Sequence, residues 1–129
     1  GVDLNTASAS LLAYISGINS GIAKNIVAYR EEHGKFKSRR ELLKVSKLGE
    51  KAFTQCAGFL RVDGGENILD NTGVHPESYG AVEKLLNFTG YTLDDVANGK
   101  IGDIKERIDK KGSARLGGAF LVERMVLRE

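Results

Sequence analysis

The stretch LLAYISGINSGIAKNIVAYREEHG (residues 11–34) decides the fold. Apolar residues recur at helical spacing on both sides of Gly17, and Gly34 closes the second run. A glycine between two such runs tolerates the positive φ that a tight turn needs. The sequence therefore predicts two short helices, over residues 7–15 and 20–33, joined by a sharp bend.

The pattern returns thirty residues later, in SKLGE (residues 46–50). Ser38 and Glu41 have the spacing of a capping box, which predicts the start of a third helix. Gly49 separates it from a fourth helix, which we expect from about residue 50 to residue 57. When the two segments are aligned with an offset of thirty residues, Gly17-Ile18-Asn19 matches Lys47-Leu48-Gly49, Ala23 matches Phe53 and Ile26 matches Cys56. Such internal repetition indicates two stacked helix-turn-helix pairs.

The helical repeat ends before RVDGGENILDNTG (residues 61–73), a connecting segment rich in glycine, asparagine and aspartate. Pro76 suits the first position of a helix, and Thr92 suits the cap of another short helix over residues 93–97. Two further helical stretches complete the tail, and no segment alternates as a strand would. We therefore predict an all-α chain with a tandem helical domain over residues 1–62 and a helical connector over residues 63–129.

The composition of the 129-residue chain is that of a folded globular protein, with 41% apolar residues. No apolar run reaches the ~20 residues of a membrane span, and the first residues lack the pattern of a secretory signal. We therefore expect a soluble, cytoplasmic protein. The chain begins at Gly1 without a methionine and stops within a helical pattern, which indicates a piece of something longer. The single cysteine, Cys56, falls on an apolar helix face and is expected in the core.

The charges are distributed unevenly. Residues 1–62 hold ten Lys and Arg against five Asp and Glu, a net charge of +5, whereas residues 63–129 hold nine against twelve, a net charge of −3. The basic half is therefore the better candidate for binding an anionic partner.

The predicted bends have a chemistry that suits a phosphate. A tight turn before a helix presents the first backbone amides of that helix, at the positive end of the helix dipole. Such amides bind phosphate, and a glycine lets a nucleic-acid backbone come close.

Residues 3–62 resemble the paired helix-hairpin-helix domain of DNA-uptake and DNA-repair proteins, whose hairpins read glycine, apolar residue, glycine. The longer run through RVDGGENILDNTGVHPESYGAVEKLL resembles the bacterial Tex family of transcription accessory proteins. The resemblance implies neighbouring domains outside this chain, among them a C-terminal OB-fold that binds RNA. It also implies that the hairpin amides contact a nucleic-acid backbone without reading its sequence.

By this resemblance the contacts fall on the two hairpins and on basic residues around them. The predicted nucleic-acid-binding residues are Ser16, Gly17, Ile18, Asn19, Gly21, Lys24, Lys37, Arg39, Arg40, Lys47, Leu48, Gly49 and Lys51. The chain departs from the family pattern at Asn19 and Lys47, each of which replaces a hairpin glycine; Asn tolerates positive φ, and Lys47 adds a cation.

Alternatives remain open at this stage. The basic residues are also consistent with an ordinary solvated surface, and the glycines with a purely structural turn. The chain would then be a protein-interaction or spacer module that positions neighbouring domains. DNA and RNA, single and double strand, and binding to the transcription machinery are not distinguished. Tyr14 and Tyr29 are expected to pack in or beside the core rather than to stack on bases.

The sequence predicts no enzyme, no metal site and no cofactor. Asp63 begins a loop and lacks the helices that build the base pocket of a DNA glycosylase. The two histidines, His33 and His75, lie too far apart in sequence to form a zinc site with one cysteine.

Overall fold

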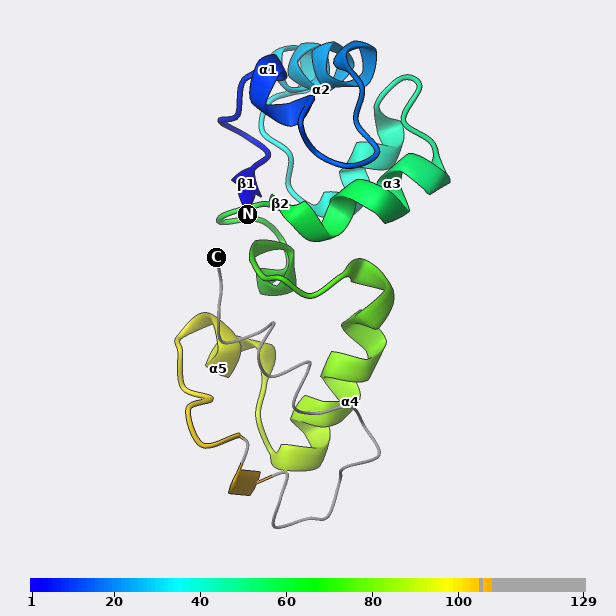
Figure 1. Cartoon of the computed structure of the whole chain (residues 1–129). Coiled ribbons are helices and arrows are strands. Elements are labelled where there is room, and N and C mark those ends of the chain that lie inside the picture. Colours follow the sequence, from blue (N-terminus) through cyan, green and yellow to red (C-terminus); the bar gives the residue numbers. More distant parts are fainter. Residues whose placement is uncertain (105, 108–129) are drawn as a thin grey trace.

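The computed structural model describes residues 1–104, 106 and 107, which form two lobes (Figure 1). The elements, in chain order, are β1 (Val2–Asp3), α1 (Ala9–Leu12), α2 (Ser20–His33), the 3₁₀ helix η1 (Arg39–Lys44), α3 (Glu50–Cys56), η2 (Ala57–Phe59), β2 (Leu60–Arg61), η3 (Ile68–Asn71), η4 (Pro76–Ser78), α4 (Tyr79–Thr89) and α5 (Leu93–Ala97). The fold is mostly helical, as predicted. Only parts of the expected tail helices lie within the described residues.

We call the lobe whose core residues run from Leu4 to Val62 the upper lobe, after its place in Figure 1. It contains two short parallel strands that the sequence did not reveal. Val2 pairs with Leu60 and Asp3 with Arg61, and the amide of Leu4 donates to the carbonyl of Arg61 at 2.9 Å. Each strand has two residues, which is too short for alternation to show in a sequence. The pairing joins the start of the first helical pair to the end of the second.

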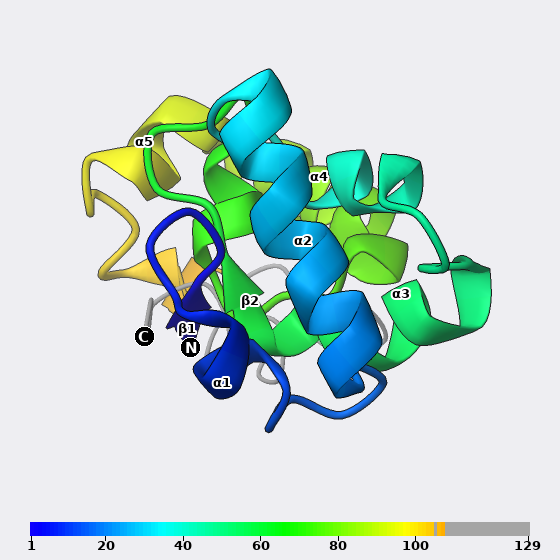
Figure 2. The same cartoon turned by 90° about the horizontal axis from the view of Figure 1, so that it is seen from above.

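The upper lobe encloses one hydrophobic core built from both helical pairs. Leu12 and Leu42 occupy equivalent positions in the two pairs, and so do Ile26 and Cys56; all four are fully buried. Seen from above, α2 crosses the lobe with α1 and α3 to either side (Figure 2). The thirty-residue repeat is therefore a repeat of buried positions.

The predicted third helix forms as the 3₁₀ helix η1, and its cap is arranged differently from the expected box. The hydroxyl of Ser38 accepts from the amide of Glu41 at 3.3 Å, as expected. The carboxylate of Glu41, however, accepts from the amide of Lys37 at 3.0 Å and from the hydroxyl of Tyr29 at 3.0 Å. Half of the capping box is therefore confirmed, and the other half is displaced by one residue.

The lower lobe has a second core, between α4, α5 and η3. Its helix starts agree with the sequence: Thr92 and Asp95 form a reciprocal capping box, and the ring of His75 accepts from the amide of Glu77 ahead of α4. None of the helices in the described part of the chain is both long enough and apolar enough to cross a bilayer.

Candidate functional site

The two predicted bends have the same backbone conformation. We name residues 16–21 hairpin 1 and residues 46–51 hairpin 2. Gly17 and Lys47 are left-handed, with φ of 88° and 68°, and the cap residues Asn19 and Gly49 are extended, with φ of −89° and −90°. Asn19 therefore does not need the positive φ that the sequence allowed for. The left-handed position lies two residues earlier, and in hairpin 2 a lysine occupies it.

The apolar residue at the centre of each hairpin anchors it to the core. Ile18 and Leu48 are 4% and 3% exposed. Their amides close the turns by donating to the carbonyls of Ile15 and Val45, at 3.0 and 3.2 Å. Ile18 and Leu48 are predicted contacts through their backbone; their side chains are buried, and their amides are engaged within the turns.

Each hairpin contacts the second helix of the other pair: hairpin 1 contacts α3, and hairpin 2 contacts α2. A Cβ added to Gly17 would lie 2.8 Å from the Cβ of Gln55 and 2.9 Å from the carbonyl oxygen of Ala52, both on α3. In return the side-chain amide of Asn25 on α2 donates to the carbonyl of Ser46 at 2.8 Å. Asn25 and Gln55 are themselves thirty residues apart. The loop after α1 accordingly descends toward α3 (Figure 1), and the two hairpins belong to one surface.

The helix starts behind the two hairpins differ. In hairpin 1 the side chain of Asn19 accepts from the amide of Ile22 at 2.8 Å, which occupies one of the amides at the start of α2. In hairpin 2 the cap is Gly49, which has no side chain to offer. A Cβ at Gly49 would meet nothing within 4 Å. Hairpin 2 therefore presents an uncapped helix start behind open space.

Exposed lysines lie in hairpin 2 and beside it: Lys47 and Lys51 belong to the hairpin, and Lys24 and Lys44 flank it. Lys24 precedes Asn25, whose bond to Ser46 brings this part of α2 to the hairpin. The left-handed backbone of Lys47 costs roughly 1–2 kcal/mol in an L-residue. Hairpin 2 thus holds a cation at a position where glycine would be the relaxed choice.

Arg39 is not on this surface, which corrects its predicted role as a phosphate contact. It is fully buried and joins the two lobes. Its guanidinium donates to the carbonyls of Leu60, Leu69, Thr72 and Val74 and to the hydroxyl of Tyr79. These bonds take up the donors that a phosphate would have needed. In the sequence Arg39 lies within a basic run and carries no sign of burial.

A buried carboxylate completes the joint. The hydroxyl of Tyr79 donates to the carboxylate of Asp70 at 2.5 Å and accepts from the guanidinium of Arg39. Tyr79 therefore links Arg39 to the carboxylate. Burial raises the pKa of Tyr79 well above its usual range, and the hydrogen bond to Asp70 raises it further, against the opposing effect of Arg39. Tyr79 therefore acts here as a neutral hydrogen-bonding bridge.

Lys37 and Arg40 are exposed but lie at the other end of η1 from hairpin 2. The carbonyl of Lys37 accepts from the amide of Glu66 at 2.8 Å, which places this residue beside the linker between the lobes. A six-residue 3₁₀ helix is about 12 Å long. The binding role of Lys37 and Arg40 therefore stays a prediction.

The two tyrosines of the upper lobe have different environments. Tyr29 is partly buried, bonded to Glu41, and stacked on Phe36 with ring centroids 5.0 Å apart, as the packing prediction required. Tyr14 is 88% exposed. The prediction that Tyr14 packs in or beside the core is therefore wrong.

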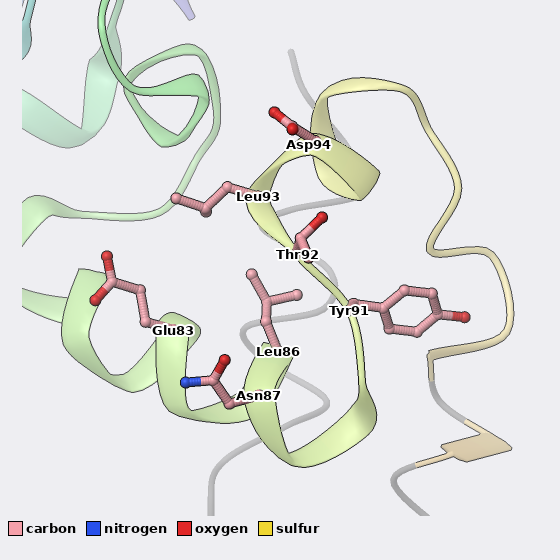
Figure 3. Close-up of a pocket in the computed structure, with 7 residues that line it drawn as sticks. All are labelled: Glu83, Leu86, Asn87, Tyr91, Thr92, Leu93 and Asp94. Atoms are coloured by element: carbon pink, nitrogen blue, oxygen red, sulfur yellow. The ribbon is translucent and has the colours of Figure 1, made fainter.

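The lower lobe carries a hollow of about 420 Å³ between α4 and α5 (Figure 3). Leu86 and Leu93 extend into the space between the helices, and Glu83 and Asp94 also line it. Two carboxylates make this hollow a poor site for an anionic partner. In the described part of the chain, no three or more His, Cys, Asp or Glu side chains gather as metal ligands would.

Two family models match the chain. Residues 1–61 match a helix-hairpin-helix motif, and residues 67–119 match a helix-hairpin-helix domain. The second match lies within the region predicted as a helical connector. How the chain divides into domains at residue 62 stays a prediction.

Known proteins with similar sequences are much longer than this chain. The transcriptional accessory protein Tex of Neisseria gonorrhoeae is 58% identical over 96 residues, which are 74% of this chain and 13% of that protein. The YhgF protein of Escherichia coli is 55% identical over 74% of this chain and 12% of its own length. The human S1 RNA-binding domain-containing protein 1 is 30% identical over 90% of this chain and 17% of its own length. The chain therefore belongs to the helix-hairpin-helix family and is similar to the corresponding region of Tex-type proteins.

Proposed function

We propose that this chain is a sequence-independent nucleic-acid backbone-binding module of a Tex-like transcription accessory protein. The observation that carries the proposal is hairpin 2. It combines an uncapped helix start, open space in front of Gly49, and the exposed Lys47 and Lys51. Backbone amides and lysines at a glycine turn are the groups that hold a phosphate.

The local charge of the hairpins supports a polyanionic ligand. Hairpin 2 contains two lysines against Glu50, and hairpin 1 contains no charged residue at all. Lys24 and Lys44 add two exposed cations from α2 and η1. The binding surface proposed here is therefore hairpins 1 and 2 with Lys24 and Lys44.

The groups on this surface favour phosphates over base edges. Reading a base requires a side chain held in place to pair with its edge. Here the exposed side chains are those of lysines, serines and Glu50, together with Asn19, whose oxygen is engaged by the amide of Ile22. They suit backbone contact, which fixes position and carries no sequence information. We therefore assign the chain a binding role.

The names of two relatives support a role in nucleic-acid binding. One carries the words RNA-binding and another the words transcriptional accessory protein. We infer that the chain contributes nucleic-acid affinity to a longer protein of this kind, in which flanking domains add their own contacts. The proposal includes both RNA and DNA as ligands.

The test is a binding titration across a salt series. Labelled single- and double-stranded 12-mers of RNA and DNA are titrated with the chain between 50 and 200 mM salt, and fluorescence anisotropy gives Kd. If three or four lysines reach phosphates, log affinity should fall against log salt with a slope of roughly −2 to −4. Oligomers of scrambled sequence should bind equally well.

The matched variants are Gly49→Val and Gly80→Val. Both glycines are exposed, and an added Cβ meets nothing within 4 Å at either. Gly49→Val fills the space in front of hairpin 2 and should weaken binding roughly tenfold, which corresponds to one lost charge-assisted hydrogen bond. Gly80→Val on α4 should bind as the parent does. Absence of salt-sensitive binding at 50 mM, or equal affinity of both variants in a folded state, would contradict the proposal.

A second candidate function is a rigid spacer, and one observation favours it. The buried Arg39 ties both lobes together through hydrogen bonds to four carbonyls. Such a joint would fix the angle between domains on either side of the chain. The two functions separate cleanly, because a spacer without nucleic-acid affinity would be insensitive to salt and to Gly49→Val in the titration above.

A further inference from the structure

Tyr14 is an aromatic side chain that the fold leaves outside. It is 88% exposed, and Leu11, three residues before it, is 47% exposed. The other tyrosines have partners within the described residues: Tyr29 bonds to Glu41, Tyr79 bonds to Asp70, and Tyr91 lies under the guanidinium of Arg107. A tyrosine ring left in water next to a leucine forms a small apolar platform.

The platform adjoins hairpin 1. The amide of Tyr14 donates to the carbonyl of Leu11 at 3.2 Å in the turn that ends the first helix, and the next residue, Ile15, is in the core. Tyr14 precedes Gly17 by three residues, which span about 10 Å at most. Each strand of a duplex advances about 3.4 Å per nucleotide, and an extended single strand advances further. A strand on hairpin 1 therefore brings its neighbouring nucleotides within reach of the Tyr14 ring.

The segment that carries this platform contains no acidic residue that would repel a polyanion. Residues 4–30 contain Lys24 and Arg30 but no aspartate or glutamate. An exposed tyrosine is also common at protein interfaces. A long segment free of acidic residues, running through hairpin 1, is the property that matches phosphates rather than a mixed protein surface.

We propose that Tyr14, with Leu11 beside it, stacks on an unpaired base of a single-stranded nucleic acid whose backbone lies along hairpin 1. The inference rests on the proposed function and narrows its ligand to a single strand. In a duplex the faces of the bases are covered by their neighbours, so the ring has nothing to stack on. Stacking also tolerates any base, which keeps the contact independent of sequence.

The affinity test compares three ligands and three variants. The ligands are a single-stranded 12-mer, the duplex of the same sequence, and an abasic 12-mer that keeps its phosphates. Tyr14→Ala should weaken single-strand binding roughly 5- to 100-fold, the range of one base–aromatic stack, and should leave duplex and abasic binding unchanged. Tyr14→Phe should bind nearly as the parent does. Phe88→Ala removes an exposed ring on α4 in the lower lobe and should have no effect.

Tyrosine fluorescence supplies a second readout, because the chain contains four tyrosines and no tryptophan. The single strand should quench part of the emission of the parent, whereas the abasic strand should not. In Tyr14→Ala this quenching should be absent. Circular dichroism should show that the variant is folded, since the side chain contributes little to packing.

The outcomes separate this inference from the proposed function. If Tyr14→Ala binds single strands as the parent does, while binding stays sensitive to salt and to Gly49→Val, the stacking inference is overturned and the backbone-binding module stands. If the parent binds the abasic strand as tightly as the intact one, the inference is likewise overturned. If no nucleic acid binds at 50 mM salt, both fail, and the platform is then a protein contact.

Discussion

Hairpins 1 and 2 follow the same backbone path thirty residues apart, but different groups complete them. Hairpin 1 has its glycine at the left-handed position and a capping side chain at Asn19. Hairpin 2 has Lys47 at the left-handed position and the glycine at its cap. The repeat therefore preserves the backbone conformation, but glycine occupies the left-handed position in hairpin 1 and the cap position in hairpin 2.

This exchange teaches that the two glycines serve different purposes. Gly17 is demanded by the fold, because its φ is 88° and α3 leaves no room for a Cβ. Gly49 is demanded by nothing inside the described part of the chain, since its backbone is extended and its surroundings are open. A glycine that the fold does not require is the better candidate for contacting a ligand. The structural explanation of the hairpin glycines therefore fits Gly17, whereas the binding role is what we propose for Gly49.

The largest expected effect concerns Arg39, whose counterpart in the first pair is Ala9. Arg39→Ala makes the second pair match the first at this position and leaves buried carbonyls without donors at the joint between the lobes. We expect a loss of about 3–5 kcal/mol in the free energy of unfolding. Chemical denaturation followed by circular dichroism measures it.

The neighbouring Arg40 provides the matched control for that experiment, because it is exposed. Arg40→Ala should change the free energy of unfolding by less than about 0.5 kcal/mol. Equal and small effects of both substitutions would mean that Arg39 does not hold the lobes together.

Alanine at the two glycines tests the comparison itself. Gly17→Ala places a Cβ against the carbonyl of Ala52 at positive φ, which should cost about 3 kcal/mol. Gly49→Ala should stay within about 1 kcal/mol, since a weaker helix cap is offset by a less flexible unfolded chain. Urea midpoints of the two variants give the difference. Similar midpoints would show that the fold does not distinguish the two glycines.

The sequence predicted the repeat, the helix starts at Thr92 and Pro76, and the buried positions, because these depend on periodicity and on local capping. It could not predict which hairpin is open, since the fate of Gly49 depends on what lies opposite it in three dimensions. Arg39 shows the same limit. A lone arginine in a basic run reads as surface, and only the carbonyls of residues 60–74, brought in by the lower lobe, make it a joint.

A reciprocal exchange of the caps sharpens the comparison on binding. Gly49→Asn introduces an oxygen that can accept from the amide of Ala52, as Asn19 does from Ile22, and should weaken nucleic-acid binding about tenfold by occupying that amide. Asn19→Gly frees the amide of Ile22 and should strengthen binding. Each exchange should alter the free energy of unfolding by only a few tenths of a kcal/mol. Anisotropy at 50 mM salt reports both. Unchanged Kd values in both variants would place the phosphate elsewhere.

The smallest effect concerns Cys56, the counterpart of Ile26 in the first pair. Burial raises the pKa of its thiol from 9.0 to about 11. The unfolded thiol therefore ionises first, so its contribution is complete below pH 9 and is lost as the pH rises from 9 to 11. At pH 10 we expect the parent to lose about 1 kcal/mol relative to pH 8 from this group. Tyr79 also has a raised pKa, so the measured quantity is the difference between the parent and Cys56→Val. If the two proteins lose the same free energy between pH 8 and pH 10, the thiol of Cys56 is not shielded from water as Ile26 is.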